Sequence, residues 1–347
     1  MDIAVTQDGK TVYAINTDCS AYLGEPTDPF NSVGCAPSSR YRYDVFKRRS
    51  IFRLRQNAPA EVILQKDEPS LSCKLPRDLE IDQQDNLYLI NALDSRIERI
   101  SPILQQETFL EIREDTDIYD RTGRPTPPLS YPPPAGLQIR SNDLYFELFK
   151  TIGEAEFVVR KVDIQTSQNQ EELFGSHAYG LSGNYYYGFV DNKIYGVALS
   201  ELPNDYIYPD RLGSFSFLQE VFSFQPNPQA AYPPPLIDLE RQPDITIKPH
   251  ELRTDSKGRI YLSDMKNHLI WTISLSGDKT TANMRVLAGS GQAGFKDGKG
   301  GDASFDTPGA LSFDGAGNLY VADTGNSAIR KVTPDGTVTT FYKAPDS

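Results

Sequence analysis

Histidine and carboxylate side chains of possible chemical importance lie in three separate stretches of this 347-residue chain. They are Asp78 in LPRDLEI, His177 in FGSHAYG, and the pair His250 and Glu251 in IKPHELRT. Imidazole and carboxylate groups that converge from different parts of a chain can hold a divalent metal or exchange protons with a bound molecule. Whether these groups converge depends on the elements that carry them.

Two of the three stretches open copies of an internal repeat. Residues 249–277 and 308–336 align without a gap, and residues 76–102 fit the same frame. The aligned positions include three prolines (Pro76, Pro249, Pro308), three aspartates (Asp82, Asp255, Asp314) and three tyrosines (Tyr88, Tyr261, Tyr320). Such self-similarity is typical of architectures in which each unit stacks on the next.

Each copy predicts a small antiparallel sheet. In the last copy the run LSF is followed by DGAG, then by NLYVAD, a Gly-Asn turn, AIRKV and the strand VTTFY. Asp and Gly tolerate the backbone angles of tight turns, and the flanking runs are rich in β-branched and aromatic residues. A meander of four strands is too small to bury both faces alone, so the units must pack against one another.

The units resemble NHL repeats, and the stretch AGSGQAGFKDGKGGDASFDTPG (288–309) is similar to the linker that precedes such repeats in bacterial NHL proteins. The resemblance implies an all-β fold, a six-bladed β-propeller of four-stranded antiparallel blades. One ring is the simplest domain organisation, because each blade buries surface against its neighbour. The expected blades span about 1–75, 76–115, 135–176, 177–225, 249–290 and 308–343.

In a propeller the first strand of each blade lines the central channel, and its leading residues open onto one mouth. Propeller geometry therefore brings Asp2, Asp78, His177, His250 and Glu251 to the same side of the ring, while Gly309 and Ala310 leave space there. We expect a ligand-binding site at this mouth, and if a calcium or zinc ion is bound, His250, His177 and Asp78 are its expected ligands.

Two enzyme families are comparable at this mouth. The run Pro249-His250-Glu251-Leu252 is similar to strand starts of peptidyl-hydroxyglycine lyases, NHL propellers that hold zinc with histidines from separate blades. A third channel histidine is missing, because His268 falls in a turn. Gluconolactonase-like propellers hold calcium with Glu, Asn and Asp, which Asp78 and Glu251 would suit. The alternative is that His250 is a hydrogen-bonded packing residue, and catalysis stays open.

Other acidic positions are assigned to the repeat itself. Asp264, Asp323 and Asn91 share the end of the second strand, where a turn-forming role is expected. Asp297 and Asp302 lack the alternating ligands of an EF-hand and belong to the linker.

Two proline-rich segments, 124–134 and 226–235, both end in Tyr-Pro-Pro-Pro and precede the innermost strand of a blade. Both should lie along one rim, with Tyr131 and Tyr232 as candidate contacts, because long loops on a rigid scaffold often carry function. The expected function is a recognition or scaffold propeller that binds a protein, peptide or glycan. The alternative is a metal-assisted lyase or hydrolase with its site around His250.

A formal charge of −12 at pH 7 disfavours nucleic acid and anionic lipid as partners. No apolar run approaches the ~18 residues of a membrane helix, and no signal-peptide pattern stands at Met1. Cys19 and Cys35 flank an insertion with little apolar content, so either they form a disulfide or all three cysteines, Cys73 included, are free thiols. A disulfide would indicate export. The chain begins just before its first apolar strand, which suggests that an upstream segment, such as an export signal, precedes it.

Overall fold

The computed structural model describes residues 2–18, 46–69, 79–91, 96–111, 135–140, 142–150, 156–167, 169–174, 179–182, 185–190, 193–198, 237–238, 249–275 and 282–345. Within these ranges the chain forms β-strands and two short 3-10 helices, η4 (Gly300–Asp302) and η5 (Thr324–Asn326). None of the described segments is a helix long and apolar enough to cross a membrane.

The strands pair antiparallel in six sheets. The first contains β1 (Asp2–Val5), β2 (Thr11–Asp18), β3 (Phe46–Arg55) and β4 (Glu61–Pro69). The second contains β5 (Leu79–Ile81), β6 (Leu87–Asn91), β7 (Arg96–Ile100) and β8 (Gln106–Glu111). The third contains β9 (Ala135–Arg140), β10 (Asp143–Lys150), β11 (Glu156–Asp163) and β12 (Asn169–Phe174).

The fourth sheet contains β13 (Tyr179–Ser182), β14 (Tyr185–Val190), β15 (Lys193–Ala198) and β16 (Ile237–Asp238). The fifth contains β17 (Pro249–Thr254), β18 (Ile260–Asp264), β19 (Leu269–Leu275) and β20 (Ala282–Ala288). The sixth contains β22 (Pro308–Phe313), β23 (Leu319–Asp323), β24 (Ala328–Val332) and β25 (Thr337–Lys343), with β21 (Gly298–Lys299) added on the edge of β25.

One strand lies away from its expected place. The sequence predicted the fourth strand of the 177–225 unit at 217–224, which falls outside the described residues. The strand that pairs with β15 is β16, beyond the expected border.

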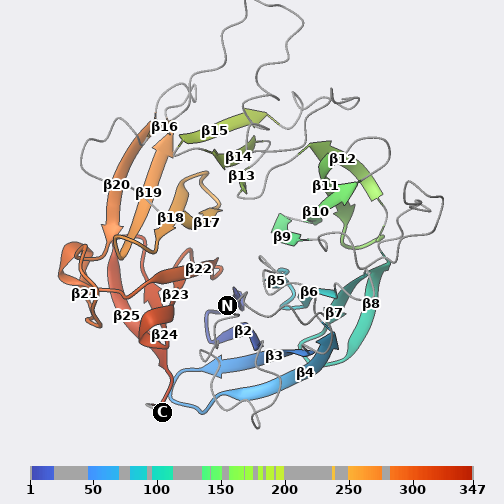
Figure 1. The fold of residues 1–347 in the computed structure, drawn as a ribbon, viewed down its shortest axis with the longest axis horizontal. Helices are drawn as coiled ribbons and strands as arrows, with labels where there is room; N and C mark the ends of the chain where they lie inside the picture. The colour runs from blue at the N-terminus through green and yellow to red at the C-terminus, as the bar shows by residue number, and fades with distance from the viewer. Residues whose placement is uncertain are drawn as a thin grey trace, which may run out of the picture.

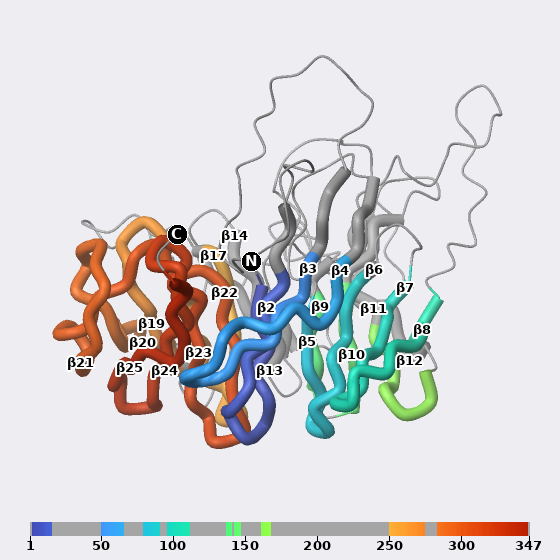
Figure 2. Tube along the Cα trace, turned by 90° about the horizontal axis from the view of Figure 1, so that it is seen from below, coloured from blue at the N-terminus to red at the C-terminus, as the bar shows by residue number. Residues whose placement is uncertain are grey.

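The sheets follow one another around a common centre, with β1, β5, β9, β13, β17 and β22 innermost (Figure 1). Seen from the edge, they stand side by side at one level (Figure 2). Inner strands touch in the pairs β1 and β5, β5 and β9, β13 and β17, and β17 and β22, and β22 of the last sheet touches β1 of the first. The prediction of an all-β propeller is confirmed by this arrangement.

The aligned aspartates fold the hairpins between the first and second strands of their units. Oδ1 of Asp82 accepts the N–H groups of Gln84 and Asn86 at 2.8 and 2.9 Å. Asp255 and Asp314 accept the N–H groups two and four residues later in the same way. Each carboxylate satisfies donors that the turn leaves unpaired, as short polar side chains do in turns.

Buried apolar side chains gather between consecutive sheets. Four such clusters join the first sheet to the second, the second to the third, the fifth to the sixth, and the sixth to the first. At these four junctions the sheets bury apolar faces against each other, so the described core is a set of interfaces between neighbouring sheets.

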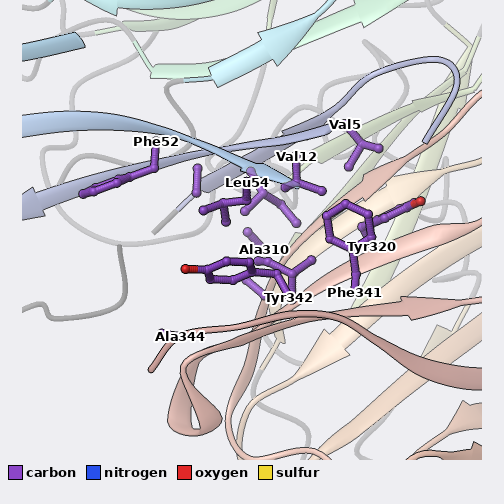
Figure 3. Close-up of a cluster of buried hydrophobic side chains, with 13 residues drawn as sticks. Val5, Val12, Phe52, Leu54, Ala310, Tyr320, Phe341, Tyr342 and Ala344 are labelled. Atoms are coloured by element: carbon purple, nitrogen blue, oxygen red, sulfur yellow. The ribbon is translucent and has the colours of Figure 1, made fainter. Parts of the chain in front are cut away.

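The first and last sheets meet without exchanging a strand. Side chains from both sheets share one apolar cluster, in which Val12 and Leu54 come from the first sheet and Ala310 and Tyr342 from the last (Figure 3). The hydroxyl of Tyr320 also donates to the carbonyl of Gly9 at 2.8 Å. This seam closes the ring through packing and hydrogen bonds.

The linker 289–307 is fixed to the sixth sheet by a buried arginine. Arg330 is fully buried, and its guanidinium binds Asp297 at 2.6 Å and Asp323 at 2.9 Å while lying over the Phe305 ring. Asp297 also accepts the N–H and hydroxyl of Thr340. Its carboxylate thus binds protein groups, in agreement with its assignment to the linker.

Candidate binding site at the mouth of the channel

The structure describes some of the residues expected at the mouth. His250 and Glu251 lie at the start of β17, and Asp2 lies at the start of β1. Four expected site residues lie outside the described residues (Asp78, His177, Tyr131, Tyr232), as do all three cysteines (Cys19, Cys35, Cys73).

The two neighbours His250 and Glu251 form a β-bulge in β17. Pro249 pairs with Asp264, but the next pair is Leu252 with Leu262, so two residues face Ser263 alone. The same irregularity recurs between Pro308 and Leu311. Bulges re-aim side chains, and here His250 is exposed to solvent whereas Glu251 is 2% exposed.

The buried carboxylates at this level bind the next sheet. Oε2 of Glu251 accepts the N–H of Leu311 on β22 at 2.8 Å. Oδ2 of Asp2 accepts the N–H of Leu79 on β5 at 3.1 Å, and Oδ1 accepts the N–H of Ile3 at 2.8 Å. Both carboxylates therefore join consecutive inner strands.

An ion pair crosses the channel one layer deeper. The guanidinium of Arg253 on β17 donates to Oε1 of Glu80 on β5, three sheets away in the ring, and also to Glu251 at 2.5 Å. The side chains of Arg253 and Glu80 are 11% and 12% exposed. Arg140 on β9 donates to the hydroxyl of Thr254. Glu80, Arg253 and Arg140 were not among the candidates from sequence.

Three acids share Arg253 in these two layers. Burial raises the pKa of Asp2, and the charge of Glu251 adds to that rise, whereas Arg253 and two backbone N–H groups oppose it. Burial likewise raises the pKa of Glu80 to about 7, against the lowering effect of Arg253. Burial disfavours the charge of Arg253, but the three carboxylates together raise its pKa above its ordinary value. The arrangement can therefore bind and release a proton near neutral pH.

His250 keeps an accessible edge because its neighbour on β22 is glycine. A Cβ atom added to Gly309 would lie 3.4 Å from Cδ2 of His250 and 3.2 Å from the hydroxyl oxygen of Thr324. Any larger side chain would fill the space between these two polar groups. The mouth thus presents the His250 imidazole to solvent, with the half-buried Thr324 near it.

The described residues contain no group of three or more His, Cys, Asp or Glu side chains placed to hold a metal ion. Of the three expected metal ligands, only His250 belongs to that part of the chain. Zinc or calcium at the mouth therefore stays a prediction.

Comparisons with known proteins give one sequence match and several solved structures. No family model matches the chain. Protein SUPPRESSOR OF QUENCHING 1, chloroplastic, from Arabidopsis thaliana is 45% identical over 75 residues, which are 22% of this chain and 7% of the plant protein.

Three solved structures illustrate the structural similarity. A protein of unknown function from Bacteroides thetaiotaomicron has a TM-score of 0.48 at 12% identity, covering 100% of this chain and 88% of that one. An auxiliary nutrient binding protein from Bacteroides ovatus has a TM-score of 0.45 at 13% identity, covering 77% and 57%. Virginiamycin B lyase from Staphylococcus aureus has a TM-score of 0.41 at 11% identity, covering 95% and 88%.

Proposed function

We propose that this chain is an exported, six-bladed propeller of the NHL type that acts as a recognition or scaffold protein. A protein, peptide or glycan would bind along the rim formed by segments 124–134 and 226–248, with Tyr131 and Tyr232 as contacts. Nucleic acid is not the expected partner, because the chain carries a formal charge of −12.

The observation that supports this proposal is the structural role of the channel carboxylates. Asp2 and Glu251 bind backbone N–H groups of the next sheet, and Glu80 binds Arg253 across the ring. Buried carboxylates that hold a scaffold together are poorly placed to change partners during a reaction. A rigid ring suits recognition by the loops that it supports.

Binding to a glycan array and to a displayed peptide library would test the rim. A ligand selected by the intact chain should lose at least tenfold in affinity with Tyr131→Ala or Tyr232→Ala, because aromatic side chains dominate recognition surfaces. Ile103→Ala is the matched control, since Ile103 is 83% exposed in the turn between β7 and β8. Equal binding by all three variants would exclude the two tyrosines as contacts, and no binding to either library would count against the proposal.

A metal-assisted lyase or hydrolase is the second candidate, and the exposure of His250 beside Gly309 favours it. Protein purified without chelator should then contain about one zinc or calcium ion per chain, and His250→Ala should remove it without loss of stability. A variant that loses stability, in a protein that never contains metal, would make His250 a packing residue and end this candidate.

A further inference from the structure

His268 bridges the fifth and sixth sheets outside the channel. It lies in the turn between β18 and β19, with φ of 55°. Its Nδ1 accepts the N–H of Thr307, the last linker residue before β22, at 3.0 Å. Oδ1 of Asp306 lies 3.5 Å from the same nitrogen and accepts the Thr307 hydroxyl at 2.9 Å.

Both sides of this contact are held firmly. On the histidine side, Asp264 accepts the N–H groups of Lys266 and Asn267 at 3.2 Å and so fixes the turn. On the linker side, the N–H of Asp306 donates to Asp323 at 2.7 Å. Gly325 packs so closely that an added Cβ would lie 2.5 Å from Cγ of Asp306. The positions of the imidazole and of Thr307 are therefore both restrained by the surrounding structure.

We propose that His268 is a proton-operated clamp on the end of the linker. The clamp is closed when the imidazole is neutral, because Nδ1 then has a lone pair for the Thr307 N–H. An imidazolium carries hydrogen on both nitrogens and cannot accept a hydrogen bond. Uptake of one proton therefore breaks the bond to Thr307 and turns the new Nδ1–H toward the carboxylate of Asp306.

The unfavourable backbone conformation of Thr307 favours movement of the linker once the hydrogen bond to His268 is lost. The Thr307 φ of 54° is unfavourable for a β-branched residue and persists only while the surroundings enforce it. Losing the bond from its N–H removes one of those restraints. Opening of the clamp should therefore let residues 306–308 relax.

Among the described residues, the charged groups near the His268 imidazole are consistent with its protonation toward Asp306. Asp306 faces it from the linker, and Asp264 and Lys266 belong to its own turn. Asp323 lies behind Asp306, where Arg330 pairs with it. Asp306 is thus the carboxylate in contact with His268, and histidine ordinarily changes charge between pH 5 and 8.

The clamp is next to the mouth of the channel. Thr307 leads directly into Pro308 and Gly309, and Gly309 lies against His250. Two residues further on, the N–H of Leu311 binds Glu251. Acidification should therefore loosen the β22 side of the mouth, whichever ligand binds there.

Trp271 provides a built-in reporter. It is the single tryptophan of the chain, and its indole N–H donates to Asp264, the residue that fixes the His268 turn. Fluorescence of the full chain titrated from pH 8 to 5 should follow a one-proton transition. His268→Asn should abolish it, because asparagine keeps an acceptor near the Nδ1 position, tolerates positive φ and does not titrate. His250→Asn is the matched control and should keep the transition.

Hydrogen exchange of the Thr307 amide in the wild-type chain reports directly on its hydrogen bond to His268. Above the pH of the transition each unit of acidification multiplies the protonated fraction by about ten, so the protection of Thr307, corrected for the intrinsic exchange rate, should fall about tenfold per pH unit and then level off below the transition. A transition that persists in His268→Asn would overturn the proposal. So would the absence of any transition in the wild type, or Thr307 protection that stays constant with pH.

Discussion

Replacing Glu80 with glutamine should remove much of the pH dependence that the channel imposes on folding. Glutamine has the shape of the carboxyl group and keeps an oxygen for Arg253, but it cannot ionise. The variant therefore separates the charge of Glu80 from its hydrogen bond across the ring.

The magnitude follows from the raised pKa. Burial raises the pKa of Glu80 from 4.5 to about 7, so the folded chain keeps a proton that the unfolded chain has already released. The stability that this proton contributes is fully present below about pH 4.5 and is lost as the pH rises to about 7. An interval of about 2.5 pH units corresponds to about 3 kcal/mol of unfolding free energy.

Urea unfolding of both proteins at about pH 4.5 and pH 8 would measure this free energy. The stability of Glu80→Gln relative to wild type should be about 3 kcal/mol higher at pH 8 than at pH 4.5. Glu107→Gln, which removes an exposed carboxylate paired with Arg99, should change by less than about 0.5 kcal/mol between the two conditions. A change below about 1 kcal/mol for Glu80→Gln would refute the buried, proton-holding state of this residue.

Three further predictions concern Arg253, Gly9 and the cysteines. Arg253→Met should destabilise the fold by about 3–5 kcal/mol at pH 8 and by less at pH 5, where the acids left without a partner become protonated; chemical unfolding at both pH values measures this. Gly9→Ala should cost about 2–3 kcal/mol in thermal unfolding, because Gly9 has φ of 67° and a Cβ there would lie 2.7 Å from Asp314 and 2.8 Å from the Tyr320 hydroxyl. Gly317→Ala isolates the backbone part, about 1 kcal/mol, since Gly317 has φ of 80° but open space around it. Mass spectrometry of the unreduced protein should find Cys19 linked to Cys35 and Cys73 free; free thiols at the first two positions would remove the main argument for export.

The features that could be predicted from sequence are local ones. Asp82, Asp255 and Asp314 form their turns because the carboxylate and the N–H groups that it accepts lie within four residues. Strand positions follow from alternation and turn residues in the same way. A propeller repeats such units, so the architecture can be inferred once the repeat is aligned.

The channel could be predicted only in part. Arg253 and Glu80 are 173 residues apart, and their pairing depends on which strands face each other across the ring. The alignment does contain a signal, because Glu251 and Arg253 occupy the positions of Asp78 and Glu80, so the second of the two positions carries opposite charges in two units. The bulge that turns His250 outward and Glu251 inward has no comparable signal, since it depends on strand register.

One position of the repeat shows how the ring compensates for an irregular copy. Leu79 and Leu311 each receive a carboxylate from the preceding sheet at their N–H groups. Ile3 is the equivalent residue of the first sheet, but the preceding sheet offers Ala310, which has no acceptor in its side chain. Asp2 supplies the missing bond with its own Oδ1 while Oδ2 still binds Leu79. One carboxylate thus satisfies a donor of its own strand and another on the next sheet. The seam between the last and first sheets is held instead by Tyr320 and the apolar cluster around it.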